Sequence, residues 1–258
     1  MRAEHIEMMK ARARNIVLRV AYDGTDYHGF QRQSPPVTAV ANVLEEKLAL
    51  VFNDSIELAA AGRTDSGVHA AGQVVNFFTD GRIPIERVPM AVNSLLPKDI
   101  SIREAWEAGR DFSARHSVVS KAYTYRVQQG RTPDPLAVRY AWHVRQPLDV
   151  ESMQKAAAFL AGEQDFSAFR AAGGADMSPV RNMFEARIEA GSCGMIEMYF
   201  HANGFLYHMV RNIVGTLVHV GQGRKSVEDF ARILSSRDRQ QASPTAPAAG
   251  LILEKVWY

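Results

Sequence analysis

The sequence has little cysteine and no long apolar run. Cys193 is the single cysteine among 258 residues, so no disulfide can form within the chain. A lone cysteine is typical of reducing compartments, and we therefore expect a cytoplasmic protein. No apolar run approaches the roughly eighteen residues that would span a bilayer, and the charged residues 1–14 lack the apolar centre of a signal peptide. We expect no membrane association, and we expect 1–14 to be a frayed or weakly helical N-terminal extension.

Lysine is scarce beside arginine, since 7 lysines and 23 arginines make up the 30 basic residues. The planar guanidinium suits phosphates and stacked bases better than an ammonium does, although such a bias can equally reflect the base composition of a genome. Position is more informative, because six cations and only two carboxylates lie between positions 111 and 145, interleaved with aromatic residues. The cations are Arg115, Lys121, Arg126, Arg131, Arg139 and Arg145. This composition is typical of a nucleic-acid surface, although a solvated strand face would look similar.

Apolar periodicity divides the chain into two halves with a similar order of elements. In the first half it predicts strands at 15–22, 55–61, 73–78 and 99–106 and helices at 38–52 and 86–95. In the second half it predicts strands at 121–129, near Trp142, at 181–190, 194–202 and 250–258, and helices at 149–162, 205–220 and 227–234. We expect an α+β fold of two similar subdomains, 15–116 and 117–258, with mostly antiparallel sheets joined around a central basic cleft.

The stretch AGRTDSGVHAAG, residues 61–72, places the carboxylate of Asp65 among glycines and beside Arg63. It is not a phosphate-binding P-loop, because Val68 and His69 stand where lysine and serine or threonine must follow. An aspartic peptidase would need a second Asp-Ser/Thr-Gly, and the chain has one. Two readings stay open from the residues alone: a polar hairpin turn, or a loop whose ionised aspartate acts as a covalent nucleophile.

A distant candidate partner is Arg211, in NGFLYHMVRNIVGTLVHVG. Helical spacing puts it on the shoulder of an apolar face, where it is either a snorkelling side chain or, if buried, a cation that needs an anion. His201, His208 and His219 do not have the i, i+4 spacing of a zinc-binding helix, and we assign them no metal.

Seven blocks together resemble the TruA-type family of tRNA pseudouridine synthases. They are YDGTDYHGFQRQ (22–33), AGRTDSGVHAAGQV (61–74), FSARHS (112–117), KAYTYR (121–126), GEQDFSAFR (162–170), HMVRNIVG (208–215) and SPTAPAAGLILEKV (243–256). The resemblance covers nearly the whole chain in order. It implies the pseudouridine synthase fold and an isomerase that detaches uracil from ribose in tRNA, rotates it and reattaches it through C5.

In this family the targets are uridines 38, 39 and 40 of the anticodon stem-loop, the enzyme is a homodimer, and no metal or organic cofactor is needed. The resemblance makes Asp65 the nucleophile, at C1′ of the ribose or C6 of the base. It makes Arg63 the residue that displaces the flipped base, Tyr123 the ring that stacks on that base, and Arg211 the partner of the catalytic carboxylate. Ser66 and His69 are then expected to be loop scaffolding.

The resemblance also implies tRNA contacts by Phe112, Ser113, Ala114, Arg115, His116 and Arg131, which lie in the basic stretch found from composition. The chain departs from the family pattern in AAGGADMSP (171–179), where relatives often have polar or basic residues that contact RNA. A non-catalytic RNA-binding module is the alternative function, and the presence of Asp65, Arg63, Tyr123 and Arg211 together argues against it.

Overall fold

The computed structural model describes residues 11–174 and 177–258, so most of the expected N-terminal extension lies outside the described residues. The described chain forms two compact units. The first comprises residues up to Val118 together with Leu253–Tyr258, and the second runs from Val119 to Ile252. The sequence had suggested a boundary at 116/117, with the C-terminal strand wholly in the second subdomain.

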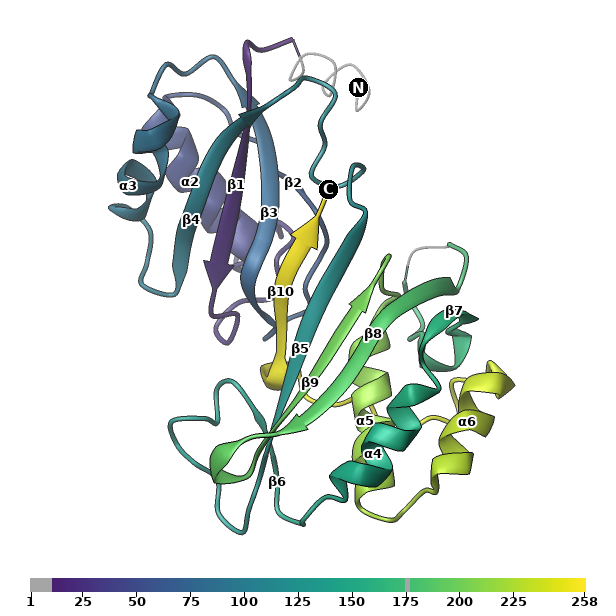
Figure 1. Cartoon of the computed structure of the whole chain (residues 1–258). Helices are drawn as coiled ribbons and strands as arrows, with labels where there is room; N and C mark the ends of the chain where they lie inside the picture. Colours follow the sequence, from purple (N-terminus) through teal and green to yellow (C-terminus); the bar gives the residue numbers. More distant parts are fainter. Residues whose placement is uncertain (1–10, 175–176) are drawn as a thin grey trace. The chain divides into compact units, whose positions relative to one another are not determined.

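The first unit is a sheet backed by helices on one face (Figure 1). Strand β1 (Arg14–Tyr22) lies between β4 (Ile100–Ala108) and β3 (His69–Thr79), and both pairings are antiparallel. The short β2 (Ala59–Ala60) also pairs with β3, and β10 (Leu251–Trp257) follows β3 in the strand order. Helices α2 (Val40–Phe52) and α3 (Val88–Asn93) lie on one face of this sheet (Figure 1), and Ile16, Val17 and Leu18 of β1 are fully buried.

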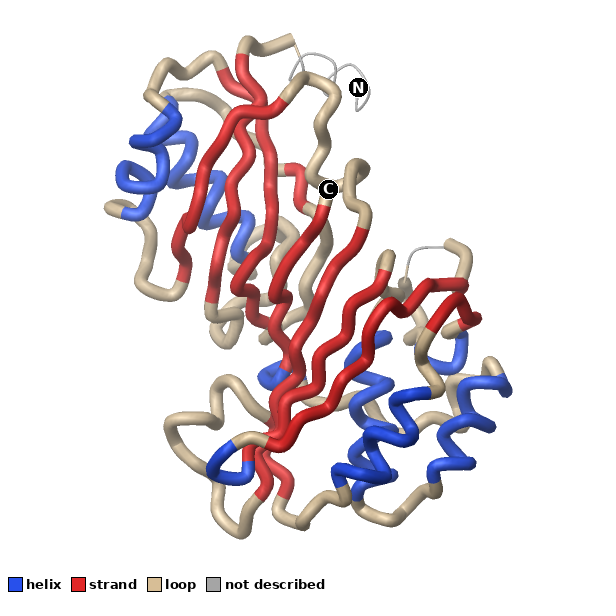
Figure 2. Tube along the Cα trace, in the orientation of Figure 1, coloured by secondary structure: helices blue, strands red, loops and turns tan. Residues whose placement is uncertain are grey.

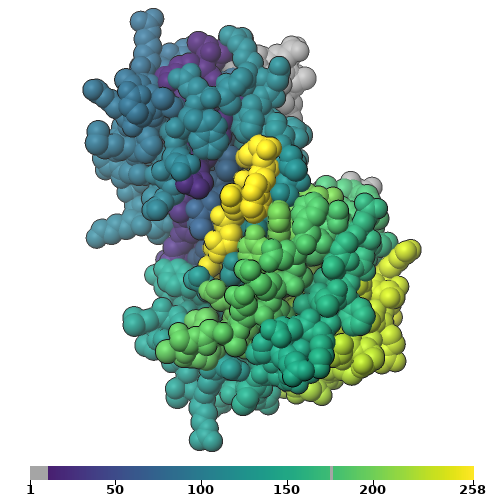
Figure 3. All heavy atoms as spheres, viewed as in Figure 1, coloured from purple at the N-terminus to yellow at the C-terminus, as the bar shows by residue number. Residues whose placement is uncertain are grey.

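The opposite face of this sheet carries a polar pair. Asn76 Nδ2 donates to Asn15 Oδ1 at 2.8 Å, and both side chains are buried. Their remaining groups bond the backbone of the segment after β4, which covers this face. Atoms of β10, drawn in yellow, are visible on the face of the molecule that Figure 3 shows.

The second unit has the strand order β5 (Ser120–Gln129), β9 (Met195–Ala202), β8 (Val180–Ala190) and β7 (Gly162–Asp165), all antiparallel. The three-residue β6 (Trp142–Val144) pairs with β5 in parallel. Three helices complete the unit: α4 (Val150–Ala158), α5 (Met209–Gly221) and α6 (Val227–Ser236) (Figures 1 and 2). The expected α+β class with mostly antiparallel pairing is confirmed.

Two predicted helix boundaries were wrong. The helix expected to begin at 205 begins at Met209, because His208 has a φ of 58°, which an α-helix cannot contain. The helix expected to run to Gly162 ends at Ala158, and Gly162 instead opens the unpredicted strand β7. None of the helices in the described ranges has the length and apolar character needed to cross a bilayer.

Candidate active site

The loop between β2 and β3 carries Arg63 and Asp65. Arg63 is exposed, Thr64 is buried and Asp65 is half-buried. The Val68 N–H donates to the Asp65 carbonyl at 3.1 Å, closing a tight turn in which Gly67 has a φ of 77°. Asp65 therefore lies in a tight turn, and the side chain of the preceding residue, Thr64, is buried.

A second segment, residues 22–30, clamps this loop from outside. The Tyr22 hydroxyl lies 2.7 Å from Thr64 Oγ1, and the Phe30 N–H donates to the Thr64 carbonyl at 3.1 Å. On the other side of Asp65, the Ser66 hydroxyl donates to the Tyr27 carbonyl at 3.2 Å. Burial raises the pKa of Tyr22, so this phenol keeps its proton. The backbone on both sides of Asp65 is thus fixed by hydrogen bonds.

Two glycines make this clamp possible. Gly29 has a φ of 84°, and a Cβ there would lie 2.7 Å from the Thr64 carbonyl oxygen. A Cβ on Gly24 would lie 2.0 Å from the Val68 carbonyl oxygen. Any side chain at either position would push the two segments apart. The resemblance assigns no role to the block at 22–33, and its glycines are what allow it to support the Asp65 loop.

His69 has a supporting position, as expected for loop scaffolding. Its side chain is buried, and its Nδ1 lies 3.1 Å from the Gly24 amide nitrogen and 3.1 Å from Asp23 Oδ1. The histidine therefore joins the end of the loop to the clamping segment.

Tyr123 and Arg211 lie in the second unit, so the predicted pairing of Arg211 with Asp65 joins two units and stays a prediction. The Tyr123 side chain on β5 is 8% exposed, and its ring meets that of Phe205 edge-on with centroids 5.0 Å apart. Arg211 is half-buried in the first turn of α5. Its Nε donates to the Ala246 carbonyl at 2.8 Å, and the Ala246 N–H donates back to the Arg211 carbonyl at 3.1 Å.

The segment that orients Arg211 is itself fixed by Arg239, which the sequence did not single out. Arg239 Nη2 donates to Asn212 Oδ1 at 3.0 Å and to Thr245 Oγ1 at 3.2 Å. Asn212 is fully buried, and Thr245 also bonds its Oδ1 at 2.7 Å. The network ties the SPTAP stretch to α5 on the helical turn that carries Arg211.

The predicted RNA-contacting positions differ in accessibility. Ala114 is fully buried. Its N–H donates to Asn76 Oδ1 at 2.8 Å, and its carbonyl accepts from the Tyr258 hydroxyl at 3.0 Å. The Phe112 ring packs on Tyr258 with centroids 4.8 Å apart. Arg115 and His116 are exposed, as is Arg131 in the loop after β5, which belongs to the second unit. Arg115 and His116 thus follow a segment that is fixed in the first unit through Phe112 and Ala114.

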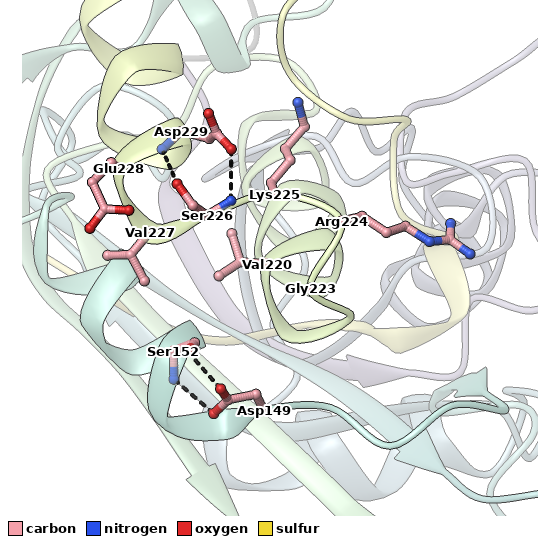
Figure 4. Close-up of a pocket in the computed structure, with 10 residues that line it drawn as sticks. All are labelled: Asp149, Ser152, Val220, Gly223, Arg224, Lys225, Ser226, Val227, Glu228 and Asp229. Carbon is pink, nitrogen blue, oxygen red and sulfur yellow. Dashed lines mark hydrogen bonds between the residues drawn. The ribbon is translucent and has the colours of Figure 1, made fainter.

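A cavity of about 490 Å³ lies between the starts of α4 and α6 and contains none of the predicted site residues (Figure 4). Two of its acidic side chains are engaged in helix caps. Asp149 accepts from the Ser152 N–H at 3.0 Å, and Asp229 accepts from the Ser226 N–H at 2.7 Å. Within 11–174 and 177–258, no three histidine, cysteine, aspartate or glutamate side chains gather closely enough to hold a metal ion.

Comparison with known proteins gives consistent matches. A family model described as tRNA pseudouridine synthase matches residues 19–117 and 156–258. Proteins named tRNA pseudouridine synthase A from Thermoanaerobacter sp. (strain X514) and Moorella thermoacetica are 44% and 46% identical, covering 95% and 94% of this chain and 100% and 99% of their own. A solved archaeal box H/ACA sRNP Nop10-Cbf5 complex aligns at a TM-score of 0.38 and 10% identity, covering 86% of this chain and 60% of that one.

Proposed function

The chain belongs to the family of tRNA pseudouridine synthases, and from this premise we propose that it isomerises uridines 38, 39 and 40 in the anticodon stem-loop of tRNA, with Asp65 as covalent nucleophile. The observation that carries the proposal is the clamped loop. A half-buried carboxylate on a backbone bonded at both flanking residues is held in one place before substrate arrives.

The chemistry requires an anionic aspartate. Its carboxylate attacks C1′ of the ribose, so that the bond from C1′ to N1 breaks and the uracil leaves with the electron pair, or it adds to C6 of the base. In both cases the bond from C1′ to N1 breaks, C5 bonds to C1′, and the bond to Asp65 then breaks so that the carboxylate is restored. The C5 hydrogen leaves as a proton, and N1 gains one. A cation beside the carboxylate favours its ionised form, which is the role we assign to Arg211.

Access to the uridine requires base flipping, because a paired or stacked base hides its reactive atoms. Flipping costs a few kcal/mol. Arg63 is exposed two residues before Asp65, and we assign it the space that the flipped base leaves. Tyr123, whose ring is already fixed by Phe205, is assigned to stack on that base.

The remaining tRNA contacts are assigned to the two exposed regions described above. Arg115, His116 and Arg131 supply charge, while Phe112, Ser113 and Ala114 shape the segment that presents the first two. A homodimer and a cytoplasmic location complete the proposal, and light scattering of the purified protein tests the dimer.

Release of tritium from tRNA that carries 5-tritiated uridine tests the reaction directly. The parent protein should release label, and Asp65→Asn, which keeps the shape of the side chain but not its charge, should not. Unimpaired release by Asp65→Asn would remove this residue from the mechanism. If the parent binds unmodified tRNA yet releases no label, the chain is a binding module rather than an isomerase.

A further inference from the structure

An exposed tyrosine just before α5 is part of an aromatic stack. Tyr207 is 43% exposed, and its ring lies on the His208 ring with centroids 4.0 Å apart and planes inclined by 29°. One face of the phenol ring is thus covered, while a large part of the residue meets solvent. An exposed aromatic ring offers a surface for a further planar ring, because offset stacking between aromatic faces is favourable.

The backbone of this pair is fixed from both sides. The Ala171 N–H donates to the Tyr207 carbonyl at 3.0 Å, and the Asn212 N–H donates to the His208 carbonyl at 2.9 Å. Gly174 packs on Tyr207, where a Cβ would lie 2.9 Å from the tyrosine Cβ. His208 has a φ of 58°, a conformation that residues other than glycine seldom adopt. The stack is therefore formed before any ligand binds, which lowers the entropic cost of binding.

Within the second unit, the stack adjoins residues that we assign to the uridine. Phe205, whose ring meets that of Tyr123, is two residues before Tyr207, so the Cα atoms of Phe205 and Tyr207 are at most about 7 Å apart. Arg211 follows four residues after Tyr207, in the first turn of α5, which is about one helical turn away. A nucleotide next to the one that Tyr123 contacts would therefore come within reach of Tyr207.

Base flipping creates a need for such a surface. A uridine that flips out leaves the base next to it without a stacking partner on one side. Proteins that bind unpaired RNA place exposed aromatic rings against unstacked bases, and every base has a face for this contact. We propose that the Tyr207 ring stacks on the base that neighbours the flipped uridine of the tRNA substrate. The proposal rests on the function proposed above.

The test compares the affinities of three variants for an unmodified tRNA transcript. Tyr207→Leu keeps an apolar side chain without a ring, and loss of one stacked base should raise its Kd about tenfold. The slope of log Kd against log salt should equal the parent's, because stacking displaces no counterions. Tyr207→Phe keeps the ring and should bind like the parent. The matched control is Phe159→Leu, because Phe159 is 45% exposed at the end of α4, and its Kd should also be unchanged.

Anticodon stem-loops with an abasic nucleotide identify the contacted base. One RNA lacks the base on the 5′ side of its target uridine, and a second RNA lacks the base on the 3′ side. With one of the two, Tyr207→Leu and the parent should bind equally, because the contact is already missing. A difference between variant and parent that persists with both RNAs would place the ring elsewhere on the tRNA and overturn the proposal.

Parent-like binding by Tyr207→Leu would also overturn it, as would an equal loss in Tyr207→Phe or a reduced salt slope, which marks a phosphate contact. Should Tyr207→Leu fail to fold by circular dichroism, Tyr207→Trp decides instead: its fluorescence in excess of the parent's should be quenched by bound tRNA, and unchanged emission refutes stacking. Tritium release by the parent separates the two proposals. Release with parent-like binding by Tyr207→Leu defeats the stacking contact alone, whereas weaker binding without release by the parent defeats the isomerase and keeps the contact.

Discussion

Replacing Lys121 with methionine should make the protein more stable at neutral pH. The ammonium group is largely buried, and burial together with the charge of Arg181 lowers its pKa from 10.5 to about 8. Each pKa unit corresponds to about 1.4 kcal/mol, so holding this charge in the folded state costs about 3 kcal/mol of the free energy of unfolding. Methionine keeps most of the length of the apolar stem and removes the charge.

The gain should depend on pH in a defined direction. Below about pH 8 lysine is protonated in both the folded and the unfolded chain, and the parent carries the full cost. Between pH 8 and 10.5 the folded state has released the proton while the unfolded state keeps it, so the stability of the parent rises with pH. The advantage of Lys121→Met should therefore fall to about half near pH 9.5 and vanish above pH 10.5.

Urea unfolding of the parent and Lys121→Met at pH 7.0 and pH 9.5, followed by circular dichroism, measures this difference. Lys155→Met is the control, because Lys155 is exposed on α4 and pairs with Glu151 at 2.7 Å, so its removal should change stability little. A Lys121→Met protein that is less stable than the parent at pH 7.0, or whose advantage does not shrink at pH 9.5, would refute the reasoning.

The other predictions concern the loop and its supports. Arg63→Ala should keep most of its tRNA affinity and lose turnover, measured as Kd and as tritium release at saturating tRNA; weaker binding with intact chemistry would make Arg63 a plain phosphate contact. Gly29→Ala should cost more than about 1 kcal/mol of stability and slow the reaction, because its Cβ would meet the Thr64 carbonyl, whereas Gly109→Ala, with nothing within 4 Å, should do neither. Arg239→Met should lower kcat more than it raises KM, since it frees the segment that orients Arg211; parent-like activity of Arg239→Lys would point to charge rather than to the bonds with Asn212 and Thr245.

Elements with strong periodicity could be predicted from the sequence. The alternation in residues 15–22 gave β1, and the strand pair near 181–202 is the antiparallel β8 and β9. Both depend on local patterns that burial of one face imposes. The four-residue β7 could not be predicted, because its sequence GEQD is polar and short, and it becomes a strand only through pairing with β8.

The site divides in the same way. The loop containing Asp65 was found from its sequence, with its role supplied by the family resemblance. The bonds that hold it, such as that between Tyr22 and Thr64, join residues 42 positions apart and have no local signature. The effect of the Arg181 charge on Lys121 depends on the register of β5, β9 and β8, and composition could mark the stretch as basic without showing it.

The C-terminal strand has a consequence for how the protein is made. Residues 253–258 belong to the first unit, where the Tyr258 hydroxyl bonds the Ala114 carbonyl, yet they are synthesised after the whole of the second unit. At 5–20 residues per second, the ribosome needs roughly 7 to 27 seconds for that stretch. During this interval the nascent first unit lacks β10, the strand that lies next to β3. The edge of β3 is then exposed and can pair with a strand of another chain. A message truncated by a few codons would leave that edge open permanently.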